Sequence, residues 1–371
     1  MDLVEVTEGT TKFLVPKQDN TEKFPPGTAP VFFNRRMEIN RDITVLLMKC
    51  LSPSTYLDAM GATGVRGFRA AHECGIETTI NEKDSDAVAL LEYNSETYCR
   101  NIEVVHSDAK VIMNERRFDA VDVDPFGSPA PFLDSASGCA KRFLFATATD
   151  TAPLCGAHLK AGIRRYAARP LNTDYHSEVG LRILLGYALR EAAKYDRGIE
   201  PLFSFAREHF VRIHLKMTNG AGRADKALEN LGYIHQCPKC PYREEEKAVL
   251  PERRTCPDCG ARLTPAGPLW LGAVSDTGII RQMTEILPET ELGSKNQIEK
   301  LLNTCMNELP SSTFYDYHRL AKTWRVSPKA IDTVIEELIN SGWKASRVHY
   351  AGTGIKTDAP LKEIKEILCR R

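Results

Sequence analysis

The sequence lacks the features that mark membrane, secreted and repeat proteins. No uninterrupted apolar stretch approaches the roughly 20 residues that span a bilayer. The first residues do not follow the charged-then-apolar pattern of a signal peptide, because Asp2, Glu5 and Glu8 interrupt it. The sequence has no internal repeat and no low-complexity tract. We therefore expect a cytoplasmic protein that makes no membrane contact.

The chain also lacks net charge, with 49 basic and 49 acidic residues. A neutral sum argues at first against a nucleic-acid partner, but phosphate binding needs only a local basic patch. The segment from Lys160 to Lys226 contains thirteen Lys and Arg residues but only seven Asp and Glu residues. This stretch is either a solvated helix face or a phosphate-binding surface, and charge alone leaves both interpretations open.

Short apolar runs alternate with helical stretches after Pro53, and a length of 371 residues allows two or three domains. Such alternation is typical of βαβ units on a parallel sheet, and so of an α/β fold. The expected helices cover residues 37–51, 65–74, 85–99, 129–141, 174–195 and 224–232. The expected strands cover residues 55–58, 78–81, 102–106, 119–123 and 143–148.

Three further segments are expected to be ordered. Residues 6–16 predict a short strand pair, and residues 204–218 predict the end of a helix followed by a strand. Near the C-terminus, apolar positions at helical spacing predict a helix-turn-helix, with Ser327 as the N-cap of its second helix. A trailing hairpin that includes residues 347–350 would complete a winged-helix-like segment.

A glycine-rich loop follows the first of these strands and opens a helix. It contains Asp58, Gly61 and Gly64. Glycines let a ligand approach the backbone, and the helix N-terminus presents unpaired amides. The spacing differs from the G-x-G-x-x-G of dinucleotide sites, and an acid precedes it. Asp58 is out of place against a pyrophosphate but suits the ammonium or sulfonium of S-adenosylmethionine.

Two more acids stand at the next strand ends. Glu82 can hold both ribose hydroxyls, and Asp108 is placed to meet an adenine edge. Any one of these acids on its own is more simply a helix cap or a solvated strand end. Three at successive strand ends behind a glycine loop favour a cofactor site.

Asp124, Pro125 and Phe126 end the fourth strand. This Asp-Pro-Phe resembles the [Asp/Asn]-Pro-Pro-aromatic motif of methyltransferases that act on exocyclic amino groups of bases. An aryl amine is a poor nucleophile, and acceptors on its N–H bonds favour the pyramidal nitrogen that attacks a methyl group. Proline keeps those acceptors aimed, and Phe126 offers a stacking face for an extruded base. In isolation the tripeptide would be a turn.

Four of the eleven cysteines form two C-x-x-C pairs separated by 15 residues: Cys237, Cys240, Cys256 and Cys259. Two such knuckles at this spacing predict tetrahedral zinc, and four thiolates leave no open position, so the metal would be structural. A redox role is the weaker alternative, because neither pair opens a helix behind a strand.

The strings DVDPFGSPAPFLDSA, VFFNRRMEINRDI, LDAMGATGVRG and TATDTAPLCG closely resemble the tRNA guanine-26 N2-dimethyltransferase family. The resemblance runs over most of the chain, including the four late cysteines and SPKAIDTVIEELINSGWKASRVHY. It implies a Rossmann-like class I methyltransferase domain, S-adenosylmethionine as donor, and one or two methylations of tRNA guanosine 26. It further implies that Phe32 and Phe126 sandwich the guanine, and that the cofactor is bound by Arg41, Arg66, Glu82, Asp108 and Ala109.

The expected domains are a methyltransferase domain over 1–232, a four-cysteine zinc module over 233–268, and a tRNA-binding domain over 269–371. The expected partner is tRNA, with no protein partner and a monomeric chain. Two alternatives stay open. One is an adenine amino-methyltransferase acting on DNA, and the other is a non-catalytic zinc and helix-turn-helix binder of nucleic acid.

Overall fold

The computed structural model describes residues 2–17, 31–99, 102–207 and 209–370. The chain divides into two compact units. Unit 1 comprises Met1–Thr147, His214–Met217 and Thr277–Leu302, and unit 2 comprises Ala148–Ile213, Thr218–Asp276 and Asn303–Arg371. The sequence predicted domain boundaries at residues 232 and 268. The division into two compact units does not test these boundaries, so they stay a prediction.

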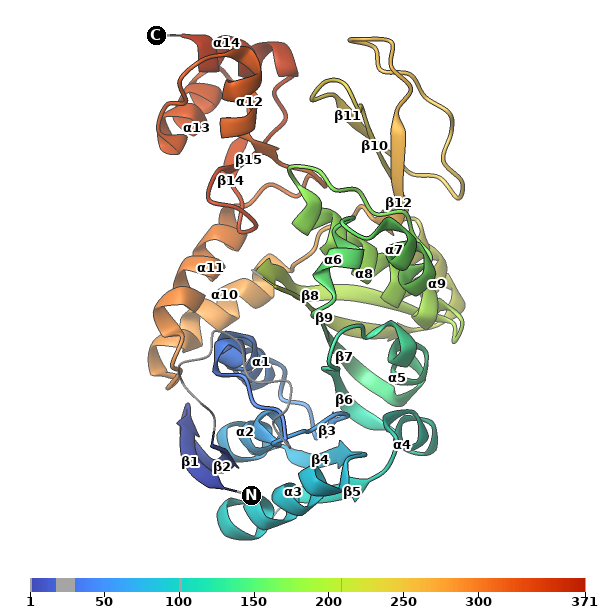
Figure 1. Cartoon of the computed structure of the whole chain (residues 1–371), viewed down its shortest axis with the longest axis vertical. Helices are drawn as coiled ribbons and strands as arrows, with labels where there is room; N and C mark the ends of the chain where they lie inside the picture. The colour runs from blue at the N-terminus through green and yellow to red at the C-terminus, as the bar shows by residue number, and fades with distance from the viewer. Residues whose placement is uncertain (1, 18–30, 100–101, 208, 371) are drawn as a thin grey trace. The chain divides into compact units, whose positions relative to one another are not determined.

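A seven-stranded sheet has the order β5-β4-β3-β6-β7-β9-β8 (Figure 1). Its strands are β3 (Thr55–Asp58), β4 (Glu77–Glu82), β5 (Ile102–His106), β6 (Phe118–Val123), β7 (Ala140–Ala148), β8 (Arg197–Arg207) and β9 (Phe210–Asn219). The first five pair in parallel, with Leu57 opposite both Thr79 and Val121. They lie where the sequence predicted strands, which confirms the α/β class.

Helices join these parallel strands, as crossover connections require. The helices of this part of the chain are α1 (Glu38–Leu51), α2 (Val65–Cys74), α3 (Ser85–Tyr98), α4 (Ala109–Glu115) and α5 (Leu133–Cys139), with short 3₁₀ turns η1 (Arg35–Met37) and η2 (Ala130–Phe132). No helix among the described residues combines the length and the apolar character needed to cross a membrane.

The strand order reverses direction beside β3, because β4 and β5 follow on one side and β6 and β7 on the other. In open α/β sheets, ligands bind outside the carboxyl ends of the strands at such a reversal. Asp58 and Glu82 end β3 and β4, and Asp124 follows β6 directly. The fold therefore gathers these carboxylates at one edge of the sheet.

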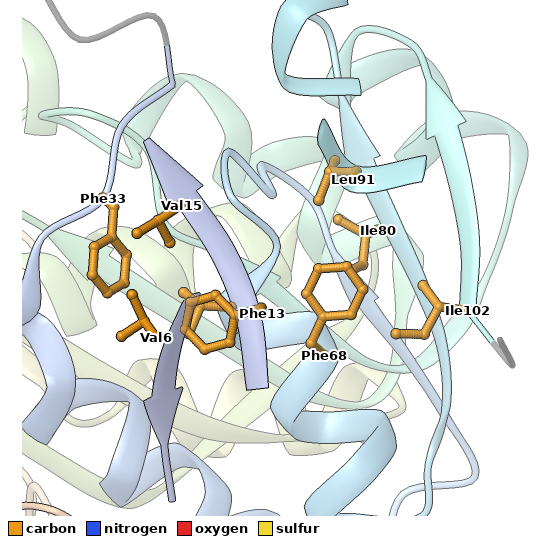
Figure 2. Close-up of a cluster of buried hydrophobic side chains, with 9 residues drawn as sticks. Val6, Phe13, Val15, Phe33, Phe68, Ile80, Leu91 and Ile102 are labelled. Atoms are coloured by element: carbon orange, nitrogen blue, oxygen red, sulfur yellow. The ribbon is translucent and has the colours of Figure 1, made fainter. Parts of the chain in front are cut away.

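The expected N-terminal strand pair is present as the antiparallel hairpin of β1 (Leu3–Glu8) and β2 (Thr11–Pro16). Its apolar face joins a buried cluster with side chains of α2, α3, β4 and β5 (Figure 2). The labelled members are Val6, Phe13, Val15, Phe33, Phe68, Ile80, Leu91 and Ile102. Hydrophobic burial thus anchors the hairpin to the elements that carry the glycine loop.

Unit 2 contains two three-stranded sheets and several helices. One sheet has the order β11-β10-β12 and the other β13-β15-β14. The elements from residue 151 onward, apart from β8 and β9, are α6 (Thr151–Leu154), α7 (Leu159–Tyr166), α8 (His176–Ala193), α9 (Ala221–Leu228), β10 (Leu231–Gln236), β11 (Arg243–Glu246), β12 (Thr264–Trp270), α10 (Thr277–Ile286), η3 (Leu287–Glu289), α11 (Lys295–Asn307), β13 (Tyr315–Asp316), α12 (Tyr317–Trp324), α13 (Ile331–Asn340), β14 (Ala345–Arg347), β15 (Gly354–Thr357) and α14 (Leu361–Cys369). Part of this list, from α10 to the first half of α11, belongs to unit 1.

The winged-helix-like segment is confirmed, since α12 and α13 form the helix-turn-helix and β14 pairs antiparallel with β15. The predicted N-cap is wrong. Helix α13 begins at Ile331 with Ala330 as its N-cap, so Ser327 lies outside the helix. The wing strand β14 also ends at Arg347, so residues 348–350 are not part of it.

For residues 204–218 the predicted strand is confirmed and the predicted helix end is wrong, because residues 204–207 belong to β8 and residues 210–218 to β9. Both strands are buried over most of their length, which hides the period-2 alternation that marks a half-exposed strand. Helix α9 also ends earlier than expected, at Leu228, and β10 starts at Leu231.

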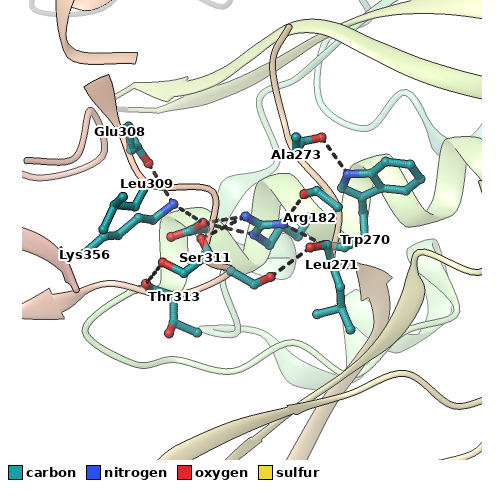
Figure 3. A network of polar contacts seen from close by, with 12 residues as sticks. Arg182, Trp270, Leu271, Ala273, Glu308, Leu309, Ser311, Thr313 and Lys356 are labelled. Atoms are coloured by element: carbon teal, nitrogen blue, oxygen red, sulfur yellow. Dashed lines mark hydrogen bonds and ion pairs between the residues drawn. The ribbon is translucent and has the colours of Figure 1, made fainter. Parts of the chain in front are cut away.

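Buried charges of unit 2 alternate in sign (Figure 3). The Lys356 Nζ lies 2.8 Å from both Glu178 Oε1 and Glu308 Oε1. Arg182 donates to Glu178 and to the carbonyls of Trp270, Gly272 and Ser311. The network joins α8, β12 and β15, so Arg182 belongs to the interior and not to a basic surface patch.

We predict that Lys356→Met destabilises the protein by about 3–5 kcal/mol, because it removes the buried cation that Glu178 and Glu308 share and leaves Glu178 paired with Arg182 alone and Glu308 with His349 alone. Denaturant unfolding measures the change. Lys362→Met is the matched control, since Lys362 is exposed and its loss should stay within about 0.5 kcal/mol of the parent. Equal unfolding of the two variants would show that the buried network contributes nothing specific.

Candidate active site

The glycine loop lies tightly against β4. Gly61 donates its N–H to the Asn81 carbonyl at 2.9 Å, and a Cβ added to Gly61 would lie 2.3 Å from Ile80 Cγ2. Gly64 adopts a left-handed φ of +80° and forms the N-cap of α2. Side chains at these positions would therefore clash or strain the turn, which accounts for the glycines.

Asp58 and Glu82 lie on either side of this loop. Asp58 is buried and accepts a hydrogen bond from the Gly67 N–H at 3.1 Å. Burial raises the pKa of its carboxyl to about 7, although Arg66 acts in the opposite direction. Glu82 accepts from the N–H groups of Ala62, Lys83 and Asp84, at 2.8, 2.8 and 3.1 Å. The backbone therefore fixes the Glu82 side chain at the strand end.

Asp108 and Ala109 open helix α4. The Asp108 carboxylate caps the helix by accepting the Lys110 N–H at 2.8 Å, and Ala109 is buried as the first helical residue. Asp108 thus has the helix-capping role that the sequence suggests for a single acidic residue at this position. Capping uses Oδ1 of Asp108 and does not preclude a ligand contact through the other oxygen.

Asp124 forms an ion pair with Arg66, whose Nη2 donates to Asp124 Oδ2. The Nη1 of the same guanidinium lies 3.5 Å from Asp122, and Asn40 Oδ1 accepts from Nη2 at 3.2 Å. Arg66 is buried, and although burial opposes the effect, these two aspartates raise its pKa above the usual value. Asp124 keeps 22% of its side chain exposed, so it is the member of this group that faces outward.

Phe32 and Phe126 are in contact. Their ring centroids lie 5.1 Å apart with an interplanar angle of 89°, and Phe126 is 84% exposed. A base between two rings needs them parallel and about 7 Å apart, since each stacking contact takes about 3.5 Å. One ring must therefore turn before a base can enter. Pro125 is buried beside them.

The Arg41 side chain contacts residues of the N-terminal part of the chain. Its guanidinium forms a buried ion pair with Glu8 of β1, donates to the Asn34 carbonyl at 3.1 Å, and lies 5.5 Å from the Phe33 ring centroid. These contacts tie α1 to the N-terminal hairpin. The structure thus gives Arg41 protein partners, and its cofactor role stays a prediction.

Several polar residues of this region carry no sequence motif. Tyr56 donates its hydroxyl to Asp122 at 2.9 Å, and both side chains are buried. Asn40 and Thr44 accept hydrogen bonds from Arg66 at 3.2 and 3.3 Å. In the sequence, Asp122 alone could have pointed to this group, because it is an acidic residue between two valines at the end of strand β6.

The four late cysteines form a cluster between the strands β10, β11 and β12. The Sγ–Sγ distance is 3.4 Å for both Cys237–Cys259 and Cys240–Cys256, and all four sulfurs lie within 4.8 Å of one another. Tetrahedral zinc with Zn–S bonds of about 2.3 Å places sulfurs roughly 3.8 Å apart. All four thiols are free of disulfides, so the donor set fits one tetrahedral metal.

The chain is similar to known proteins over nearly all of its length. The model of the family described as N2,N2-dimethylguanosine tRNA methyltransferase matches residues 9–369. A tRNA (guanine(26)-N(2))-dimethyltransferase of Methanoregula boonei is 60% identical, over 97% of this chain and 96% of the relative. One of Methanosarcina mazei is 42% identical, over 98% and 97%. The solved complex of Trm1 from Pyrococcus horikoshii with S-adenosyl-L-methionine has a TM-score of 0.89 at 38% identity, and covers 99% of this chain and 100% of that one.

The packing of the glycine loop predicts that Gly61→Ala costs about 1–3 kcal/mol of unfolding free energy, because its Cβ would overlap Ile80. Gly222→Ala in α9 is the control, since a Cβ there meets no atom within 4 Å. That change should be neutral or stabilise by up to about 1 kcal/mol. Urea unfolding compares the two, and a Gly61→Ala protein as stable as Gly222→Ala would contradict the packing described.

Proposed function

The chain belongs to the N2,N2-dimethylguanosine tRNA methyltransferase family, and we propose that it methylates the N2 amino group of guanosine 26 in tRNA with S-adenosylmethionine. The observation that carries this function is Asp124 at the reversal of the strand order, beside the glycine loop. The family match over residues 9–369 disfavours the DNA adenine methyltransferase and the non-catalytic binder.

The acids at the sheet edge are proposed to hold the cofactor. Asp58 faces its cationic groups, Glu82 its ribose hydroxyls, and Asp108 with Ala109 its adenine. Support comes from charge, since burial raises the pKa of the Asp58 carboxyl to about 7, and a cationic ligand would stabilise its ionised form. Gly61 and Gly64 leave the loop backbone open to close approach.

Arg41 and Arg66 are also proposed to contribute to cofactor binding, as the resemblance implies. The contacts of Arg66 add a second role, because its guanidinium holds Asp124 through Oδ2. That arrangement leaves Asp124 Oδ1 to accept a hydrogen bond from the amino group of guanine. Arg66 is therefore a positioning residue for Asp124.

The chemistry is an in-line displacement. When bound, S-adenosylmethionine would supply a methyl group on a sulfonium. The N–C bond forms as the S–C bond breaks, S-adenosylhomocysteine leaves as the neutral thioether, and the proton of the nitrogen passes to solvent. Asp124 stabilises the positive charge that develops on the nitrogen more than it stabilises the neutral amine. Pro125 restricts the backbone next to it, so the acceptors keep their direction. Phe32 and Phe126 stack on the guanine once one ring has turned.

Asp124→Ala should lower turnover by roughly 10²–10⁴-fold, with little change in cofactor affinity, because the carboxylate acts mainly in the transition state. Asp124→Asn keeps an acceptor oxygen but loses the charge, so we expect it to be more active than Ala and well below the parent. Single-turnover methyl transfer and calorimetric binding of S-adenosylmethionine measure both quantities.

Asp134→Ala serves as the control for this pair of variants, since Asp134 is an exposed aspartate of α5. It should retain the parental rate. A parental rate in Asp124→Ala would mean that Asp124 is only a strand-end residue. Loss of cofactor binding in that variant would place Asp124 in the cofactor pocket and require another acceptor.

The four-cysteine cluster is proposed to bind one structural zinc through Cys237, Cys240, Cys256 and Cys259. The close sulfur pairs join one knuckle to the other, as a shared metal requires, and the Lys239 N–H lies 3.4 Å from Cys237 Sγ. Such an N–H favours a thiolate. A redox pair would instead bring together the two cysteines of a single C-x-x-C. The zinc would fix the β10–β12 module and take no part in methyl transfer.

Elemental analysis should therefore give about one zinc per chain. Cys256→Ser should lose the metal and local order while S-adenosylmethionine still binds. Cys369→Ser, which changes an exposed cysteine outside the cluster, should keep the full metal content. Full metal content in Cys256→Ser would refute the proposed ligand set, and so would lost cofactor binding in a folded Cys256→Ser protein.

Residues 269–371 are proposed to contribute tRNA affinity through the winged-helix-like segment. Arg319, Lys322 and Arg325 are exposed on α12 and at its end, whereas Lys329 and Arg347 form ion pairs with Glu337 and Asp332. Arg319 lies 4.0 Å from Asp316, so Lys322 and Arg325 are the cations of this set that have no ion pair among the described residues, and they offer the charge that phosphate binding needs. The alternative is that the winged-helix-like segment contacts another protein. We propose that the chain acts as a monomer.

A further inference from the structure

Asn81 of β4 connects two loops that follow other strands. Its side chain is buried at 1% exposure, and its Nδ2 donates to the Ala59 carbonyl at 3.0 Å and to the Ser107 carbonyl at 3.1 Å. Its own backbone carbonyl accepts the Gly61 N–H at 2.9 Å. Ala59 begins the glycine loop after β3, and Ser107 precedes Asp108 after β5. One residue therefore ties both loops to the central strand between them.

This arrangement leaves one polar atom unsatisfied. The Asn81 Oδ1 is buried and has no hydrogen-bond partner among the described residues. A buried acceptor in that state costs about 1–3 kcal/mol, which a leucine of similar volume would avoid. The two N–H donors are what distinguishes asparagine from leucine here. Their acceptors are carbonyls of the loops that bear Gly61 and Asp108, so the benefit of Asn81 lies in those loops.

We propose that Asn81 is a positioning residue that fixes the glycine loop relative to the Asp108–Ala109 turn, and that cofactor affinity depends on it. The inference rests on the proposed function, in which both loops contact one S-adenosylmethionine molecule. A ligand held at two points binds well only when the two points keep their separation. Loss of the Asn81 donors lets the loops move independently, and the ordering must then come from the binding itself.

Asn94 provides a matched control. It is also a fully buried asparagine of unit 1, and it also makes two hydrogen bonds to backbone. Its Oδ1 accepts from the Leu14 N–H at 2.8 Å, and its Nδ2 donates to the Leu14 carbonyl at 3.0 Å. These bonds hold the N-terminal hairpin and neither of the two loops. A purely structural loss should therefore affect both asparagines alike.

The experiment compares Asn81→Ala, Asn81→Ser and Asn94→Ala in the full chain. Calorimetry gives the Kd for S-adenosylmethionine and for S-adenosylhomocysteine, thermal unfolding gives the Tm, and steady-state kinetics gives the KM for tRNA. Asn81→Ala should raise both Kd values by about tenfold, as expected for lost bonds to buried carbonyls, and leave the KM for tRNA within about twofold. Asn81→Ser keeps one donor and should give an intermediate Kd. Asn94→Ala should lower the Tm and keep the parental Kd.

Parental cofactor affinity in the Asn81 variants, with a Tm lowered as in Asn94→Ala, would overturn the proposal and leave Asn81 a structural residue. An equal rise in Kd for Asn81→Ala and Asn94→Ala would overturn it too. If Asn81→Ala does not fold, the Kd of Asn81→Ser against the parent decides. A parent chain that binds neither compound would instead refute the proposed function, so the two failures are distinguishable.

Discussion

The arrangement of acids at the sheet edge depends on one buried cation, Arg66. Its guanidinium forms ion pairs with Asp122 and Asp124, and its positive charge also acts to lower the pKa of Asp58. Without it, three aspartates would face one another in a region of low dielectric, where like charges repel strongly. A single positive charge offsets only part of three negative ones. Burial is the main reason why the pKa of Asp58 is raised; the negative charges of Asp122 and Asp124 add to it, and Arg66 opposes it.

This balance connects the fold to the chemistry. The sheet reversal brings the strand ends together, the glycine loop lies beside them, and Arg66 engages Oδ2 of Asp124, so that Oδ1 is the oxygen that would face the proposed substrate. Glu82 and Asp108 are held by backbone N–H groups rather than by cations, so they keep acceptor character for a ligand. In contrast, the four-cysteine cluster has a closed donor set, which suits a structural role.

Local patterns were sufficient to predict part of this structure. Strands such as 143–148 were predicted because buried parallel strands are short apolar runs, and the cysteine cluster because its spacing is local. Long-range partners were not predictable. Nothing near Arg66 in the sequence points to Asp124, and nothing near Lys356 points to Glu178. Asn81 carries no motif, because its side chain contacts carbonyls in the loops that follow two other strands. The helix end predicted within 204–218 was wrong because strands buried on both faces lose the alternation that identifies them.

The central claim is that this site methylates a guanine amino group at position 26 of tRNA. Transfer of tritiated methyl groups from S-adenosylmethionine tests it most directly, with three acceptors compared at equal concentration. These are a tRNA transcript with guanosine 26, the same transcript with adenosine 26, and duplex DNA. The account predicts incorporation into the first alone, with N2-methylated guanosine recovered on nucleoside digestion. Equal incorporation into the adenosine 26 transcript, or transfer to DNA, would contradict it.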